Sequence, residues 1–202
     1  DEADLVIAFN EQVLLSRINA NEIKPGCIIL LEDKWATHPD ANIAAVYTET
    51  RDRLLGDGYN ILEIPMEVEC LKHVPDAKRG KNMFVLGMLC SIYSLDLELG
   101  RQQVARIFAK KSDAIIKANQ ILLEAGHDWA AANLEIKYQI PAVKKSDPQI
   151  VVNGNTALSL GVLASGMQIC AMYPITPATS ASHYLSDVFN KVGGLVHQAE
   201  DE

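Results

Sequence analysis

Clustered cysteines are missing from this sequence. Its four cysteines, Cys27, Cys70, Cys90 and Cys170, lie far apart and form no CxxC pair. Zinc ribbons and local iron–sulfur loops both depend on cysteines at short, regular spacing. We therefore expect no metal site in this chain, and thiols that stay free and mostly buried in a reducing cytoplasm.

Long apolar runs and an excess of basic charge are also missing. No run approaches the roughly 20 residues that span a bilayer, and no basic-then-apolar signal segment opens the chain. The 18 lysines and arginines are outnumbered by 26 aspartates and glutamates, which gives a net charge of −8 and argues against broad nucleic-acid binding. We expect a soluble cytoplasmic protein that binds neither membrane nor nucleic acid.

The rest of the composition is typical of an ordinary globular protein. The chain has 202 residues, 49% of them hydrophobic and 22% charged, which is enough for one large domain or two small ones. It begins at Asp1 without an initiator methionine and ends in Ala-Glu-Asp-Glu directly after an apolar segment. We therefore expect a fragment that is incomplete at both ends.

The first part of the chain has the pattern of an α/β domain. Three short apolar runs, bounded by polar residues, glycine or proline, predict buried strands at residues 5–9, 27–31 and 61–64. The segments between them have helical spacing. Strands that alternate with helices predict a layered, mostly parallel sheet.

Helical spacing dominates from residue 82 onward. Asn82 has a side chain suited to an N-cap, Ser112 marks an interruption, and Gly126 has the position of a C-cap. Residues 1–140 are therefore predicted to form one α/β domain that is completed by helices.

A domain boundary is predicted at residues 141–149. This stretch contains two prolines and two lysines and has little apolar periodicity, which is typical of an extended linker. After it, residues 155–164 and 177–190 have helical patterns, and short strands are predicted at 168–172 and 195–197. Residues 150–202 are therefore predicted to begin a second α/β unit, which is too short to be complete.

The segment Tyr-Pro-Ile-Thr-Pro at 173–177 joins a predicted strand to a predicted helix. Pro177 suits the first helical position, and Thr176 can cap the free amides. The loop would then lie where open α/β sheets bind ligands and where helix amides favour an anion. On pattern alone, a plain helix start is the simpler interpretation of the same residues.

Several motifs in the second half resemble one family. The segment 173–177 is preceded by Gly154-Asn155 and Leu160-Gly161, and it is followed by the acidic run Gln-Ala-Glu-Asp-Glu at 198–202. In this order and spacing, the motifs resemble the opening of the alpha-type chain of 2-oxoacid:ferredoxin oxidoreductases, including the 2-oxoglutarate enzymes.

The earlier part resembles the gamma-type domain of the same enzymes, which some members carry ahead of the alpha-type domain. The motifs that carry this resemblance are residues 4–11, Lys81-Asn82, Leu86-Gly87, and Lys110-Lys111 with Asn119 and Gly126. Two departures are the missing Gly-rich opening segment and Thr156, where related chains often carry Glu. The implied fold is a gamma-type α/β domain followed by the start of a thiamine-diphosphate-binding, pyrimidine-type α/β domain.

The resemblance implies half of a thiamine diphosphate site. Glu202 matches the catalytic carboxylate that faces the aminopyrimidine ring, and Ile175 is implied as a second contact to this cofactor. An alignment on Glu200 instead would place the carboxylate two residues earlier. Without the family resemblance, such an acidic run would be taken as a solvated strand end.

The resemblance also implies contacts to the substrate. Thr176 matches the family threonine that lies close to the 2-oxoacid, where its hydroxyl would bind a carboxylate or carbonyl oxygen. Tyr173 and Pro177 are further substrate-side candidates, although packing explains Tyr173 equally well. His197 lies near the proposed site, but an ordinary polar role is the simpler interpretation.

Partners follow from the same resemblance. In such enzymes a beta-type subunit holds the diphosphate, its Mg²⁺ and an iron–sulfur cluster, so a hetero-oligomer active only with this partner is implied. It would oxidise a 2-oxoacid, 2-oxoglutarate being favoured, with coenzyme A as co-substrate and ferredoxin as electron acceptor. A pyruvate or indolepyruvate oxidoreductase, and a non-catalytic assembly module of such a complex, remain alternatives.

The basic residues Lys78, Arg79 and Lys81 have two interpretations. Ahead of a helix, they could meet a phosphate such as that of coenzyme A. A solvated loop is the more ordinary interpretation of such a group.

Overall fold

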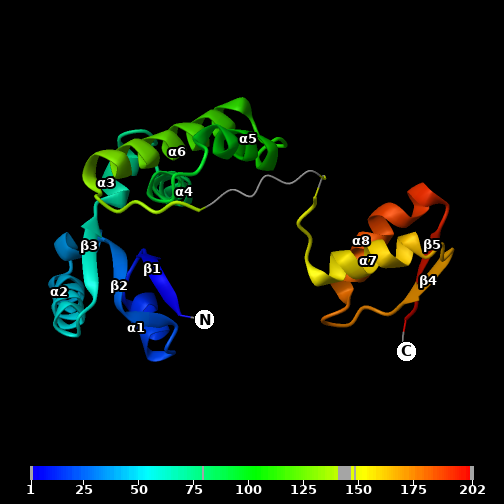
Figure 1. The fold of residues 1–202 in the computed structure, drawn as a ribbon, viewed down its shortest axis with the longest axis horizontal. Coiled ribbons are helices and arrows are strands. Elements are labelled where there is room, and N and C mark those ends of the chain that lie inside the picture. The colour runs from blue at the N-terminus through cyan, green and yellow to red at the C-terminus, as the bar shows by residue number, and fades with distance from the viewer. Residues whose placement is uncertain (1, 79, 141–146, 148, 201–202) are drawn as a thin grey trace. The chain divides into compact units, whose positions relative to one another are not determined.

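The computed structural model describes residues 2–78, 80–140, 147 and 149–200. It divides the chain into two compact units, Asp1–Ala142 and Val143–Glu202. Each unit combines helices with a parallel sheet (Figure 1), so the predicted α/β class is confirmed. In the part of the chain that is described, no helix combines the length and apolarity needed to cross a membrane.

The first unit is built on a three-stranded parallel sheet of order β1-β2-β3. The strands are β1 (Ala3–Ala8), β2 (Ile23–Glu32) and β3 (Asn60–Ile64), which confirms the three predicted strands. The crossovers contain α1 (Glu11–Asn19), the 3-10 helix η1 (Asp33–Thr37) and α2 (Ala41–Gly56). Such crossovers are required because each parallel strand must start from the same end of the sheet.

The central strand β2 is buried on both faces. Successive side chains of a strand point to opposite faces. Leu30 accordingly packs into a core with α3 (Met66–Leu71), α4 (Lys81–Ile92) and α6 (Asp113–Asn133), whereas Ile29 and Leu31 pack into a core with α1 and α2. All three side chains are fully buried. This double burial explains why β2 is a continuous apolar run in the sequence.

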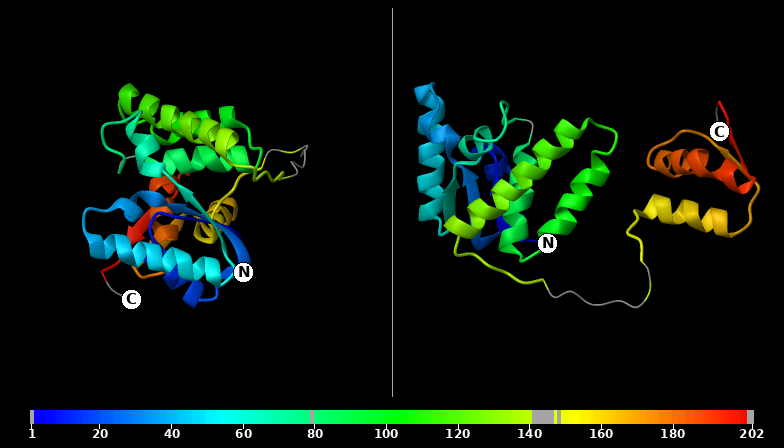
Figure 2. Two further views of the ribbon diagram at one scale, coloured as in Figure 1. Left: turned by 90° about the vertical axis from the view of Figure 1, so that its left-hand side faces the viewer. Right: turned by 90° about the horizontal axis from the view of Figure 1, so that it is seen from above.

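Helices α4, α5 and α6 lie beside one another on one face of the sheet (Figure 2). The helices of this layer are α3 (Met66–Leu71), α4 (Lys81–Ile92), α5 (Leu97–Ile107) and α6 (Asp113–Asn133). Ser112 is the N-cap residue of α6, which confirms the predicted interruption. The predicted cap at Asn82 is wrong, because α4 already begins at Lys81 and its N-cap residue is Gly80.

Gly126 lies inside α6 and does not end it. The predicted C-cap is therefore wrong, because the helix continues to Asn133. A Cβ atom on Gly126 would collide with the backbone carbonyl of Phe84 in α4, and one on Gly87 would collide with the backbone of Leu123 in α6. The two glycines therefore allow the backbones of α4 and α6 to approach closely.

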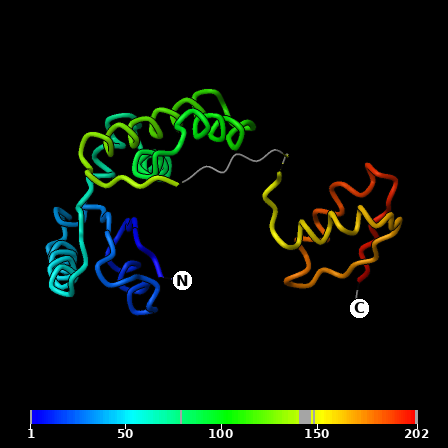
Figure 3. The backbone as a smooth tube through the Cα atoms, in the orientation of Figure 1, coloured from blue at the N-terminus to red at the C-terminus, as the bar shows by residue number. Residues whose placement is uncertain are grey.

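The second unit contains α7 (Gly154–Ala164), β4 (Ile169–Met172), α8 (Thr179–Val188), the 3-10 helix η2 (Phe189–Val192) and β5 (Leu195–Gln198). The two strands pair in parallel, with Ile169 opposite Leu195 and Met172 opposite Gln198. Helices α7 and α8 lie side by side (Figure 3). These elements confirm the predicted order, although α8 starts two residues later than predicted.

Candidate functional site

The loop of residues 173–178 joins β4 to α8 and is the candidate substrate-binding segment. It leaves the sheet at the carboxyl end of β4 and runs back toward the first turn of α7 (Figure 3). Open α/β sheets bind their ligands outside the carboxyl ends of their strands. The loop therefore occupies the kind of position at which a ligand is expected.

Thr176 and Pro177 lie in a turn before α8, which corrects the predicted helix start. The helix begins at Thr179, its N-cap residue is Ala178, and no side chain caps it. The Thr179 amide instead donates a hydrogen bond of 3.0 Å to the Ile175 carbonyl and closes the turn. The Thr176–Pro177 peptide bond is cis. Because the helix cap does not use it, the Thr176 hydroxyl is available to a ligand.

The side chains proposed for ligand contact are accessible on this unit. Tyr173 is 37% exposed and Ile175 is 50% exposed. Thr176 and Pro177 are exposed as well. The loop therefore offers the hydroxyls of Tyr173 and Thr176 and several apolar surfaces, a combination suited to a small organic anion next to a ring. The individual substrate and cofactor roles of these residues stay predictions.

Asn155, in the first turn of α7, is hydrogen-bonded to the end of this loop. Its side-chain Nδ2 donates to the Pro177 carbonyl at 2.8 Å and to the Ser180 hydroxyl at 2.6 Å. Asn155 appeared in the sequence only as part of a family motif, without a role of its own. The available signal was an asparagine just inside a helix whose cap is already formed by Asn153, which accepts from the Thr156 amide.

The predicted catalytic residue Glu202 lies outside the described residues. Glu200, the alternative carboxylate, is exposed shortly after β5. The Ala199 amide donates to the Met172 carbonyl at 2.8 Å, so the chain remains beside the end of β4 up to that point. The strands are parallel, and the acidic run therefore begins at the same edge as the loop 173–178. His197 is exposed on β5, opposite Ala171.

A group of four charged side chains lies at the carboxyl ends of β2 and β3 in the first unit. Lys81 Nζ donates to Glu32 Oε2 and to Glu67 Oε2, each at 2.7 Å. Lys34 Nζ donates to the same Glu67 oxygen at 2.8 Å. Glu32 is fully buried. Lys81 is therefore not part of a solvated loop, while Lys78 is exposed and Arg79 lies outside the described residues.

These ion pairs change the ionisation of Glu67 and Lys81. Hydrogen bonds from Lys34 and Lys81 lower the pKa of Glu67 below its usual value of 4.5. Burial opposes the charged form of Lys81, but the hydrogen bonds to Glu32 and Glu67 outweigh it and raise the pKa of Lys81 above 10.5. The two negative charges of Glu32 and Glu67 are thus balanced by the two positive charges of Lys34 and Lys81. The group serves to join β2, η1, α3 and α4.

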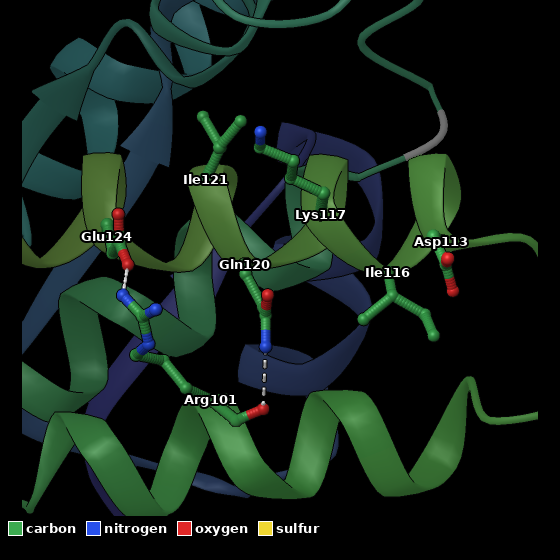
Figure 4. Close-up of a pocket in the computed structure, with 7 residues that line it drawn as sticks. All are labelled: Arg101, Asp113, Ile116, Lys117, Gln120, Ile121 and Glu124. Carbon is green, nitrogen blue, oxygen red and sulfur yellow. Dashed lines mark hydrogen bonds and ion pairs between the residues drawn. The ribbon is translucent and has the colours of Figure 1, made fainter.

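A cavity of about 420 Å³ lies between α5 and α6 (Figure 4). Arg101 on α5 pairs with Glu124 on α6, and the Gln120 side chain donates to the Arg101 carbonyl at 3.2 Å. The lining residues include no histidine, cysteine, serine or threonine. Throughout the described ranges, no three His, Cys, Asp or Glu side chains form a group that could hold a metal ion. The ion pair and the hydrogen bond in this cavity join α5 to α6. Its lining residues do not form an arrangement typical of a catalytic site.

Comparison with protein families decides the class of this chain. Residues 1–129 match the family model described as pyruvate ferredoxin/flavodoxin oxidoreductase. The chain belongs to this family. The resemblance inferred from the sequence is thereby confirmed, although the matched residues end within the first unit and do not reach the loop 173–178.

Two relatives of this chain are named for 2-oxoglutarate. The 2-oxoglutarate oxidoreductase subunit KorA of Mycobacterium tuberculosis is 29% identical over 217 residues, which cover 100% of this chain and 33% of the relative. The 2-oxoglutarate synthase subunit KorA of Archaeoglobus fulgidus is 36% identical over 52 residues, 26% of this chain and 15% of the relative. The chain thus spans a third or less of the length of these relatives.

A solved structure has the same fold. It is the 2-oxoglutarate:ferredoxin oxidoreductase from Magnetococcus marinus with 2-oxoglutarate, coenzyme A and succinyl-CoA bound. The TM-score is 0.77 at 24% identity, and the match covers 100% of this chain and 32% of that chain. The α/β fold of this chain is therefore the fold of the matching part of that structure.

Proposed function

We propose that this chain is part of a subunit of a 2-oxoacid:ferredoxin oxidoreductase. The complete enzyme would carry out thiamine-diphosphate-dependent oxidative decarboxylation of a 2-oxoacid to its acyl-CoA, with reduction of ferredoxin. The observation that carries the proposal is the segment 173–177 at the carboxyl end of a parallel strand, in a chain that belongs to this family. Relatives named for 2-oxoglutarate favour that acid as substrate.

The residues at this edge suit one half of a thiamine diphosphate site. When bound, the cofactor supplies the electron sink for decarboxylation. The exposed Ile175 side chain offers an apolar contact to the aminopyrimidine ring. Glu202, at the end of the acidic run 198–202, would hydrogen-bond a ring nitrogen and share its proton. Such a ring requires an apolar contact for its face and a carboxylate for its nitrogen.

Thr176 is proposed to bind the 2-oxoacid. Its hydroxyl is not used by the helix cap, and it lies in the turn closed by the Thr179 amide. A hydroxyl at this position can donate to the carboxylate or carbonyl oxygen of the substrate. Tyr173 and Pro177 would then form the apolar walls beside it.

The remaining parts of the reaction are assigned to partners. A beta-type subunit would hold the diphosphate, Mg²⁺ and an iron–sulfur cluster and would pass electrons to ferredoxin, so activity requires the hetero-oligomer. The four cysteines of this chain are free, and Cys27, Cys70 and Cys90 are buried. Free thiols suit a reducing compartment, and we place the enzyme in the cytoplasm.

The proposal is tested on the complete enzyme purified with its partner subunit. Reduction of ferredoxin is measured with coenzyme A and either 2-oxoglutarate, pyruvate or indolepyruvate. We expect 2-oxoglutarate to have the highest kcat/KM. A preference for another of these acids would reassign the substrate, and turnover of none of them would favour a non-catalytic assembly role.

A further inference from the structure

The loop 173–178 is tied to a neighbouring helix by a single side chain. Among the described residues, Asn155 on α7 is the one side chain from outside the loop and α8 that hydrogen-bonds this loop. The remaining hydrogen bonds described for the loop are to α8: the Thr179 amide donates to the Ile175 carbonyl, and Ala181 and Ser182 donate to the Ala178 carbonyl. The direct hydrogen bond between the turn and α7 therefore depends on one amide group.

The chemistry of asparagine suits this contact. The Pro177 carbonyl can only accept a hydrogen bond, so the Asn155 atom 2.8 Å from it must be the nitrogen. That nitrogen has two hydrogens, and the second is directed to the Ser180 hydroxyl at 2.6 Å. One side chain thus holds the end of the loop and the first turn of α8 together.

The backbone of Asn155 is itself held in place by a hydrogen bond. Ser159, one turn further along α7, is fully buried, and its hydroxyl lies 2.8 Å from the Asn155 carbonyl and 3.1 Å from the Ala181 carbonyl. This hydroxyl joins α7 to α8, one turn away from the contact between Asn155 and the loop. Asn155 therefore reaches the loop from a fixed backbone, as a positioning residue requires.

We propose that Asn155 is a positioning residue for the 2-oxoacid, acting through the Pro177 carbonyl on the adjacent Thr176. This inference rests on the proposed function for its substrate, because Thr176 is assigned to the 2-oxoacid there. Asn155 does not touch the reacting atoms. It sets the direction in which the Thr176 hydroxyl points, and a small misplacement of such a group weakens substrate binding and turnover.

The variants Asn155→Ala and Asn155→Asp test this role in the complete enzyme with its partner. Asn155→Asp keeps the shape of the side chain but removes both amide donors. If Asn155 acted through packing alone, this variant would have the parental kcat/KM. We expect both variants to lower kcat/KM for 2-oxoglutarate about threefold to tenfold, the value of one or two hydrogen bonds. The KM for coenzyme A should not change.

The matched control is Ser186→Ala. Within the described part of the chain, the hydroxyl of the exposed Ser186 bonds only inside α8, to the Ser182 carbonyl at 2.9 Å. We expect parental kinetics from this variant. Parental kcat/KM in Asn155→Asp, or a loss of thermal stability in both Asn155 variants without any change in kcat/KM for 2-oxoglutarate, would overturn the positioning role.

Hydrogen exchange separates this inference from the proposed function, because it needs no turnover. In Asn155→Ala, the amides of residues 173–180 should exchange faster than in the parent, while those of β4 and β5 should not change. Unchanged exchange in 173–180 would overturn the inference. If exchange is faster in Asn155→Ala but the parent enzyme turns over no 2-oxoacid, control of the loop by Asn155 is supported and the proposed substrate is rejected.

Discussion

Gly126 of α6 packs directly against the backbone carbonyl of Phe84 in α4, at a point where a Cβ atom has no room. Phe84 is fully buried in the core between the sheet and these helices. The helices α4 and α6, which cover this side of the sheet, are therefore packed together through a direct contact between their backbones.

Gly126→Ala should destabilise the first unit. The added methyl group must push α4 and α6 apart, and such overpacking typically costs about 1–3 kcal/mol. The free energy of unfolding in urea, followed by circular dichroism, measures the effect. Gly161→Ala is the matched control, because Gly161 is also inside a helix but has nothing within 4 Å of its Cβ position. Equal effects of the two substitutions would contradict the close approach.

Lys81→Met should destabilise the same unit strongly. It leaves the fully buried Glu32 without its cation, and breaking a buried ion pair on one side costs about 3–5 kcal/mol. Lys72→Met breaks the exposed pair with Glu69 and should cost at most about 1 kcal/mol. Chemical denaturation of both variants makes the comparison. A small effect at Lys81 would show that Glu32 finds another partner.

Stability should fall with acid through Glu67. Its folded-state pKa is below 4.5, so the unfolded chain binds the proton more readily than the folded one. The contribution of Glu67 is therefore present above pH 4.5 and is lost as the pH falls through the lower, folded-state pKa. Urea midpoints measured from neutral pH to below 4.5 should show this slope in the parent and less of it in Glu67→Gln.

The control for this titration is Glu49→Gln. Glu49 is exposed on α2, and no ion pair of its side chain occurs among the described residues. The pH dependence of this variant should follow the parent. If Glu67→Gln and Glu49→Gln behave alike, the ion pairs of Glu67 do not govern acid stability.

Thr176→Ala should weaken turnover of the 2-oxoacid in the complete enzyme. Loss of a hydrogen bond to a charged group costs about 1.5–3 kcal/mol, which corresponds to a decrease of roughly tenfold or more in kcat/KM. Thr176→Ser keeps the hydroxyl and should retain most of the activity. Steady-state kinetics of Thr176→Ala that equal those of the parent would remove this residue from the substrate site.

Glu202→Gln should abolish turnover while the subunits still assemble. The amide cannot share a proton with the cofactor ring, and losing such proton transfer costs at least about a hundredfold in rate. Size-exclusion chromatography of the complex and ferredoxin reduction are measured on the same sample. Full activity in Glu202→Gln, with Glu200→Gln inactive, would assign the role to Glu200.

The strand and helix pattern was predictable because it depends on neighbours in sequence. The continuous apolar run of β2 predicted a strand covered on both faces, and Leu30 and Ile29 are indeed buried on opposite sides. The helix start at Thr176 and Pro177 was wrong because the same two residues also suit a turn. Only the hydrogen bond from Thr179 to Ile175 distinguishes these two arrangements.

The sequence by itself determined the α/β class, the order of the elements and the position of the 173–177 loop after a strand, because apolar periodicity and turn residues are local signals. Only the tertiary structure decided what the isolated polar and small residues do. Gly126 looked like a helix end until α4 was seen against it, and Lys81 looked solvated until Glu32 was found beside it. The partners are distant in sequence, so no local pattern contains them.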